Sequence, residues 1–367
     1  MVEKIKQQLR SKLDQDYVIL ALEERGYCVS LLKNGKTTKK ESRNANDFLE
    51  LIDSSVVSWV DFVVDNFKTE SIDVAKALGF SEVLVRSLLK NKQGGYEDLT
   101  TEMGVLLPAI IVSGFNVRLD PLLILIKQNL VVTIHSTEAK RFFRLRRYGE
   151  IFMRKIETKV PQQDKVTQIL IRILDENNSR NFDHLREIEE NSDKLSRKLA
   201  DPRTSREILG PEIYNMKHAL ITYLGGLWAT VDVLNTLRYG DPEVLTDNPK
   251  LLERIGALVT EVNNHIGVAE HLSEVLASGL EVLQSIYNNQ LQILNNRLAI
   301  LVAYLTIIGT AVLVPNTLAT VLSNPAYGMG PADAGWYSAL LVISTVVAII
   351  VAYGWVKKTG WLPSRPE

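Results

Sequence analysis

The sequence predicts a mixed α/β domain, then a series of long helices, and finally two membrane-spanning helices. Three observations support this fold class. Strand-like and helix-like segments alternate over residues 1–160, the pattern is helical alone over 161–296, and two long apolar runs follow. We therefore expect an α+β domain whose mixed sheet is covered by helices, and a long stalk helix that connects this cytoplasmic domain to the membrane.

The composition limits the partners that the chain can have. Its 367 residues, 46% of them hydrophobic, are enough for two or three domains with cores of their own. The 42 basic and 43 acidic side chains nearly cancel, so we expect no nucleic-acid partner. Cys28 is the only cysteine, which excludes an intramolecular disulfide and cysteine-based zinc sites.

The first part of the chain contains several short strand candidates. Tyr17 to Leu22 and Tyr27 to Leu32 flank a Glu-Arg-Gly turn, which predicts a hairpin. Asp73 to Gly79 is typical of a short helix that ends at Gly79, and Ser81 with Glu82 begins the next helix. The other strand candidates are 56–62, 105–112, 122–126 and 130–135.

From about Gln163 the pattern is helical. A first segment runs to Ala200, residues 201–205 break it, and a second helix fits Pro211 to Arg238 with the proline in its first turn. A third helix starts at about Leu251 and meets no proline before Pro315, which predicts a rod of roughly 100 Å. A helix of this length needs support along its side, most simply from copies of itself.

Two apolar runs predict membrane spans at 297–323 and 336–356. Residues 298–323 and 336–356 carry no charged side chain, and each run is long enough to cross a bilayer. Arg297 precedes the first run, and Lys357 and Lys358 begin a basic tail at 357–367. The positive-inside rule then places both termini in the cytoplasm and the loop 324–335 outside. We expect a multi-pass protein of the inner or plasma membrane, in contact with lipid.

Small and polar side chains follow one face of the long helix into the first span, while large leucines lie off that face. Hydroxyl and amide groups are costly in hydrocarbon unless they are paired or hydrated. The face could line a water-filled axis between several copies, or it could mark close helix packing without a pore. Neutral asparagine and threonine oxygens favour the pore, because they can bind the waters of a hydrated cation. The candidate pore-lining residues are Asn296, Ala303, Thr306, Thr310, Leu313, Asn316, Thr317 and Thr320.

The order of these parts resembles the CorA family of divalent-cation channels. Local matches agree, and they are LGFSEVLVRSLL (78–89), NLVVTIH (129–135), LTII (305–308) with Pro315 and Thr317 after it, YGM (327–329) and an aromatic-basic end (353–361). The resemblance covers essentially the whole chain. It implies a funnel-shaped homopentamer whose first span lines the pore. It also implies that the transported ion is Mg²⁺, with Co²⁺ or Ni²⁺ as alternatives, and that Mg²⁺ bound to the cytoplasmic domain gates the channel.

The outer loop departs from the signature of that family. The family has Gly-Met-Asn, whose asparagine ring meets the hydrated ion, and this chain has Gly-Met-Gly. The channel could have a rebuilt ion site at its mouth, a different ion preference, or no conduction at all. A rebuilt site would use backbone carbonyls or the side chains of Asn324 or Asp333. The candidate outer mouth therefore consists of Asn324, Tyr327, Gly328, Met329, Gly330 and Asp333.

Two pairs on the stalk helix are weak candidates for a metal site. Glu261 and His265 are four residues apart, and so are Glu270 and Glu274, so each pair shares a helix face. Each pair could be half of an inter-subunit Mg²⁺ site or a pair of solvated groups. Asp61 could likewise be a ligand at a sheet end or an acid in an ordinary turn.

The sequence predicts a transport protein and no enzyme. It has no G-x-S-x-G motif for a nucleophilic serine and no phosphate-binding G-x-x-x-x-G-K-[ST] motif. We expect a divalent-cation channel. The alternatives are a non-conducting membrane sensor or scaffold with the same architecture, and a zinc transporter of the same superfamily.

Overall fold

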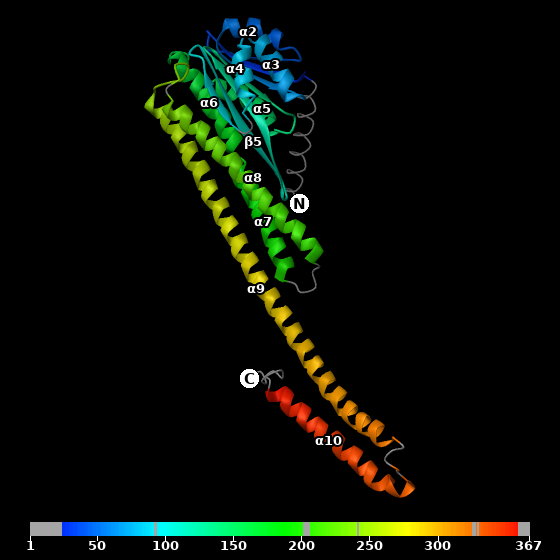
Figure 1. The fold of residues 1–367 in the computed structure, drawn as a ribbon. Coiled ribbons are helices and arrows are strands. Elements are labelled where there is room, and N and C mark those ends of the chain that lie inside the picture. The colour runs from blue at the N-terminus through cyan, green and yellow to red at the C-terminus, as the bar shows by residue number, and fades with distance from the viewer. Residues whose placement is uncertain are drawn as a thin grey trace, which may run out of the picture. The chain divides into compact units, whose positions relative to one another are not determined.

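The computed structural model describes residues 24–91, 94–200, 206–240, 242–324, 328 and 330–358. The chain divides into two compact units, unit one ending at Ala277 and unit two beginning at Ser278. The boundary falls inside helix α9 (Pro249–Leu322), which has 74 residues (Figure 1). The long helix predicted from the absence of proline is therefore present, and it continues past Pro315.

Unit one contains a seven-stranded sheet with the order β2-β1-β3-β7-β6-β5-β4. Among these strands β3 and β7 pair in parallel, and the other neighbours are antiparallel. The mixed sheet predicted from the sequence is confirmed. The strands are β1 (Gly26–Leu32), β2 (Thr37–Ser42), β3 (Ser55–Val63), β4 (Gly95–Asp98), β5 (Glu102–Ser113), β6 (Asn116–Lys127) and β7 (Leu130–His135).

Both faces of the central strands are buried. On β6, Leu122 and Ile124 belong to one hydrophobic cluster, whereas Leu123 and Leu125 belong to the cluster on the opposite face. This alternation follows from the two-residue period of a strand. Strands that are covered on both sides appear in the sequence as continuous apolar runs, which is why the central strands were predictable.

Short helices cover one face of the sheet. They are the 3₁₀ helix η1 (Ala45–Phe48) and the α-helices α2 (Leu49–Ser54), α3 (Phe67–Ala77) and α4 (Glu82–Leu88). Gly79 has a φ of 81°, a conformation that favours glycine, and it terminates α3 as predicted. Ser81 then caps α4 by accepting from the Leu84 amide at 3.3 Å.

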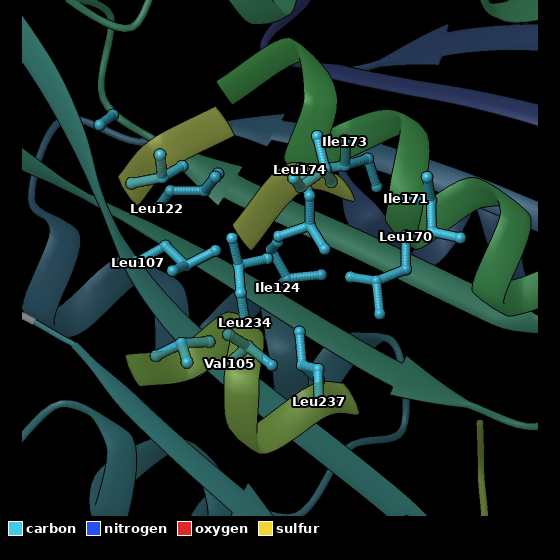
Figure 2. Packing of buried hydrophobic residues seen from close by; sticks show 14 of the residues in the cluster. Val105, Leu107, Leu122, Ile124, Leu170, Ile171, Ile173, Leu174, Leu234 and Leu237 are labelled. Atoms are coloured by element: carbon cyan, nitrogen blue, oxygen red, sulfur yellow. The ribbon is translucent and has the colours of Figure 1, made fainter. Parts of the chain in front are cut away.

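The longer helices cover the other face. They are α5 (Arg141–Met153), α6 (Gln162–Asn178), α7 (Asn181–Ala200), α8 (Arg206–Tyr239) and the first part of α9. Figure 2 shows how Leu170 and Leu174 of α6 and Leu234 of α8 pack near Leu107 and Ile124 of the sheet. Helices 162–178 and 206–239 thus share the hydrophobic core of the sheet.

Two local predictions differ from the structure. Both edges of β1 are occupied, by β2 on one side and β3 on the other, so the predicted hairpin of Tyr17–Leu22 with Tyr27–Leu32 is wrong. Tyr17–Leu22 itself lies outside the described residues. Helix α8 begins at Arg206, and Pro211 lies inside it instead of in its first turn. At the sixth position of the helix the proline lies beyond the first four amides, and it removes the hydrogen bond that an amide there would donate to the Glu207 carbonyl.

Unit two contains the end of α9 and helix α10 (Ala334–Lys358), connected through the 3₁₀ helix η3 (Pro331–Asp333). The Tyr337 hydroxyl of α10 lies 3.5 Å from the Ala319 carbonyl oxygen of α9. Buried residues in these two helices are mostly small, such as Ala303, Ala348 and Ala352. The large aliphatic side chains are exposed, as expected for lipid-facing positions, and include Leu301, Leu305, Ile308, Val312, Val342, Ile343 and Ile350.

Candidate functional site

Three described helices are long and apolar enough to cross a membrane, and they are Leu209–Tyr239, Tyr287–Leu322 and Pro331–Lys358. The first of these packs against the sheet through residues such as Leu220, Tyr223 and Leu227. In the other two only 11% and 17% of the most apolar window is buried in the protein. The two spans predicted from the sequence are therefore the helices whose apolar surface the protein leaves uncovered.

The threonine hydroxyls of the predicted pore face all donate to the backbone of their own helix. Thr306 Oγ1 lies 2.8 Å from the Val302 carbonyl oxygen, and Thr310 Oγ1 lies 2.8 Å from that of Thr306. The other two hydroxyls repeat this geometry, Thr317 with the Leu313 carbonyl at 2.8 Å and Thr320 with the Asn316 carbonyl at 2.7 Å. This is the usual way in which a helical threonine satisfies its donor.

These hydrogen bonds decide which groups the four threonines present to their surroundings. A hydroxyl has one proton and two lone pairs, so a threonine whose proton is used within the helix presents only acceptors to its surroundings. A row of such oxygens can accept hydrogen bonds from the waters of a hydrated cation. It offers no donor to an anion.

The other residues of the predicted face differ in exposure. Asn296, Leu313 and Asn316 are exposed, and Thr306 and Thr310 are half-buried. Ala303 is 0% exposed, so its side chain is covered within the protomer itself. The exposed members of the face are therefore the asparagines, Leu313 and the threonines from position 317 onward.

An open cavity of about 440 Å³ lies at the outer loop. Of the predicted mouth residues, the structure brings Asn324, Gly328, Gly330 and Asp333 together around this cavity, where Ser323 and Tyr337 also contribute. The Asn324 side chain is exposed. Tyr327 and Met329 lie outside the described residues.

Asp333 makes a set of contacts that the sequence reasoning missed. Its Oδ2 accepts from the Gly330 amide at 3.0 Å, and its Oδ1 accepts from the indole nitrogen of Trp336 at 3.1 Å. The Asp333 amide in turn donates to the Gly330 carbonyl at 3.0 Å. Gly330 is thus the N-cap of η3. The spacing of a cap residue and an acid three positions later was the available signal.

The backbone at Gly330 does not require glycine. Its φ of −114° and ψ of 175° are extended values that other residues adopt, and a Cβ built there would meet nothing within 4 Å. An asparagine would fit the same position, and asparagine is among the preferred N-cap residues.

The metal candidates all lie on the single helix α9. Glu261, Glu270 and Glu274 are exposed, whereas His265 is buried, and burial lowers the pKa of His265 while Glu261 opposes this shift. No group of three His, Cys, Asp or Glu side chains that could hold a metal ion occurs within the described ranges. A complete site would need ligands from another copy of the chain.

Asp61 is neither in a turn nor at a sheet end. It lies inside β3, fully buried, where it accepts from Arg146 Nε at 2.6 Å and from Thr133, with His135 Nε2 at 3.2 Å. Both of its predicted roles are wrong. Arg146 comes from α5, so this ion pair connects the sheet to the helices that cover it.

The family model described as CorA-like Mg²⁺ transporter protein matches residues 54–358. The chain belongs to this family. CorA-like proteins are ion transporters and not enzymes. This chain is therefore a membrane transport protein for divalent cations. A search of the curated proteins finds no match to the sequence.

Solved structures share the CorA-like fold over most of the chain. The CorA magnesium transporter from Methanocaldococcus jannaschii is 21% identical, covers 92% of this chain and 98% of its own, and has a TM-score of 0.67. The full-length CmaX protein is 17% identical, covers 91% and 98%, and has a TM-score of 0.59. The ZntB cytoplasmic domain from Vibrio parahaemolyticus RIMD 2210633 is 12% identical, covers 72% and 98%, and has a TM-score of 0.52.

Proposed function

We propose that this CorA-like protein is a Mg²⁺ channel that works as a homopentamer. The predicted pore face of α9, called the stripe from here on, surrounds a common axis in this assembly. Both termini are cytoplasmic, and α9 and α10 each cross the membrane once. Transport is passive, since the sequence has no ATP-binding motif. Co²⁺ and Ni²⁺ are further ions that such a path would accept.

The observation that carries this proposal is the donor arrangement of the threonine hydroxyls at 306, 310, 317 and 320. With their protons directed into the helix, these hydroxyls present lone pairs alone. Mg²⁺ gives up its waters reluctantly, so neutral acceptors that bind those waters suit its passage. The proposed lining is Asn296, Thr306, Thr310, Leu313, Asn316, Thr317 and Thr320, without the covered Ala303.

At the outer mouth, Asn324 is the best substitute for the asparagine that the family signature has at position 330. Asn324 carries the same amide side chain, and Gly330 lines the cavity at the outer loop. Asn324 is exposed and lines the same cavity. A ring of Asn324 side chains would bring neutral amide oxygens to the hydrated ion.

Mg²⁺ would regulate the channel by binding to acidic residues on the stalk part of α9. The pairs Glu261 with His265 and Glu270 with Glu274 each offer two possible ligands on one helix turn. The carboxylates are exposed, so a neighbouring protomer can complete the coordination.

Flux into liposomes tests the proposal. Purified protein is reconstituted with a magnesium-sensitive dye inside, and Mg²⁺ is added outside. We expect entry of Mg²⁺ above that of empty vesicles. No flux from an intact oligomer would exclude conduction and leave the sensor or scaffold function.

Zinc transport is the second candidate, because the cytoplasmic domain of ZntB shares the fold of the soluble part. The same liposomes with a zinc-sensitive dye separate the two ions. A flux of Zn²⁺ that exceeds the flux of Mg²⁺ at equal concentration would favour the zinc transporter.

A further inference from the structure

Asp333 is the one acidic residue between Leu298 and Val356. A carboxylate at the mouth of a cation path could act on the ion through its charge. It could also act indirectly, by holding the loop in place. The contacts of the two carboxylate oxygens distinguish these roles.

Each oxygen of Asp333 has a protein donor. Oδ2 accepts from the Gly330 amide at 3.0 Å, and Oδ1 accepts from Trp336 Nε1 at 3.1 Å. These two donors fix the direction of the carboxylate, and a divalent cation that bound it directly would have to share oxygens that already accept from the protein. Trp336 is 49% exposed at the start of α10, and Asp333 is the acceptor that its indole N–H has in the protein.

The same contacts connect the loop to both helices of unit two. Trp336 lies in the first turn of α10, and its neighbour Tyr337 donates to the Ala319 carbonyl of α9 at 3.5 Å. Gly330 is therefore connected through Asp333 and Trp336 to the start of α10, and from there to α9. Gly330, Asp333 and Tyr337 all line the cavity, so this chain of contacts runs along its wall.

We propose that Asp333 and Trp336, together the Asp333–Trp336 clip, are positioning residues that set the geometry of the outer mouth, and that the carboxylate itself does not bind the ion. This inference rests on the proposed channel function. It assigns the selectivity of the mouth to the placement of neutral groups, with no direct contribution from a carboxylate ring.

Two substitutions separate the clip from a direct charge effect. Trp336→Phe removes the indole donor and keeps the Asp333 charge, and Asp333→Asn removes the charge at nearly constant size. The clip predicts that either variant raises the Mg²⁺ concentration for half-maximal flux, roughly fivefold for one ordinary hydrogen bond, while the maximal flux is retained. The double variant is then no worse than the more affected single variant, because both break one unit.

Trp355→Phe is the matched control, since Trp355 is an exposed tryptophan at the other end of α10. It should leave the half-maximal concentration unchanged. If Trp336→Phe behaves like the wild type while Asp333→Asn raises the half-maximal Mg²⁺ concentration, the clip is overturned and a direct charge effect is favoured.

A spectroscopic readout tests the clip independently of conduction. Fluorine NMR of the full chain carrying fluorotryptophan should show a shifted Trp336 resonance in Asp333→Asn and an unchanged Trp355 resonance. A Trp336 resonance that does not respond to Asp333→Asn would overturn the clip. If wild-type liposomes show no flux but the resonance responds, the channel function fails and the clip stands.

Discussion

The Arg146 guanidinium donates to Asp61 Oδ2 at 2.6 Å, and both side chains are almost completely removed from solvent. Asp61 comes from the parallel β3–β7 pair and Arg146 from α5, so the ion pair lies between the sheet and the helical layer. Arg146 also donates to the carbonyl of Arg25 at 2.9 Å. A buried charge that loses its partner is costly, which makes this pair a sensitive point of unit one.

Arg146→Met should lower the free energy of unfolding by about 3–5 kcal/mol, because it leaves the Asp61 carboxylate buried without the guanidinium that pairs with it. Thermal unfolding of the full chain in detergent measures the change. Arg118→Met is the control, since Arg118 and Glu138 form a pair at 3.2 Å in which both side chains are 52% exposed. Its cost should stay within about 1 kcal/mol. Equal losses in the two variants would contradict the assigned role of Asp61.

The free energy of unfolding of unit one should depend on pH through the Asp61 carboxylate. Burial alone would raise the pKa of Asp61, but His135, Arg146 and the hydrogen bond from Thr133 outweigh burial and hold the pKa well below its usual range. The folded state is therefore stabilised above the unfolded pKa of about 4, and this stabilisation is lost as the pH falls towards the folded-state value. The deficit of Asp61→Asn relative to wild type should shrink as the pH is lowered below 4 in unfolding experiments. A deficit that is constant with pH would show that Asp61 is not ionised in the fold.

Gly330→Asn should fold like the wild type and strengthen Mg²⁺ binding at the outer mouth. The extended backbone and the open space at Gly330 accept a side chain, and asparagine caps a helix as well as glycine does. We expect an unchanged unfolding temperature and a lower Mg²⁺ concentration for half-maximal flux. Gly335→Asn adds the same amide at a second position with open space and should change only the stability. If both variants alter the flux equally, position 330 has no special place at the mouth.

Asn324→Ala should alter the competition between Mg²⁺ and Co²⁺ in flux measurements, because it removes the proposed amide ring from the cavity. Ser338→Ala is the control, since that hydroxyl bonds within α10 to the Ala334 carbonyl at 2.8 Å. The same competition in Asn324→Ala and wild type would remove Asn324 from the ion path.

Cysteines placed on the threonine stripe should react with a membrane-impermeant thiol reagent. Thr310→Cys and Thr317→Cys are expected to react, because their positions face water in the proposed pore. Ala303→Cys, at a covered position, and Leu301→Cys, at a 57% exposed position among the lipid-facing side chains, should stay unmodified. Labelling at all four positions, or at none, would favour close packing of the stripe without a pore.

The sequence predicted the elements whose pattern follows from burial. The central strands β5, β6 and β7 and the two apolar spans appear as long apolar runs. Strand β2, TTKKES, has no apolar residue and lies at the sheet edge, so no hydrophobic pattern indicated it. Helix α5 was missed because arginines occupy buried positions in it, among them Arg141 and Arg146.

The candidate site was predictable in position along the chain and unpredictable in its contacts. The threonine spacing already indicated one helix face, and the helix confirms that these hydroxyls share the same backbone geometry. The hydrogen bonds of the Asp333 carboxylate depend on the backbone angles at Gly330 and on the side-chain direction of Trp336. Those quantities come from tertiary placement, which residue types alone do not specify.

The most direct test of the cation path is the reversal potential of the reconstituted protein in a planar bilayer. Under a tenfold gradient of MgCl₂, a stripe of acceptor oxygens predicts a current that reverses close to the Mg²⁺ equilibrium potential, about 30 mV in size for a divalent ion. A reversal potential of the opposite sign, which chloride would produce, or the absence of current from an intact oligomer, would contradict the account.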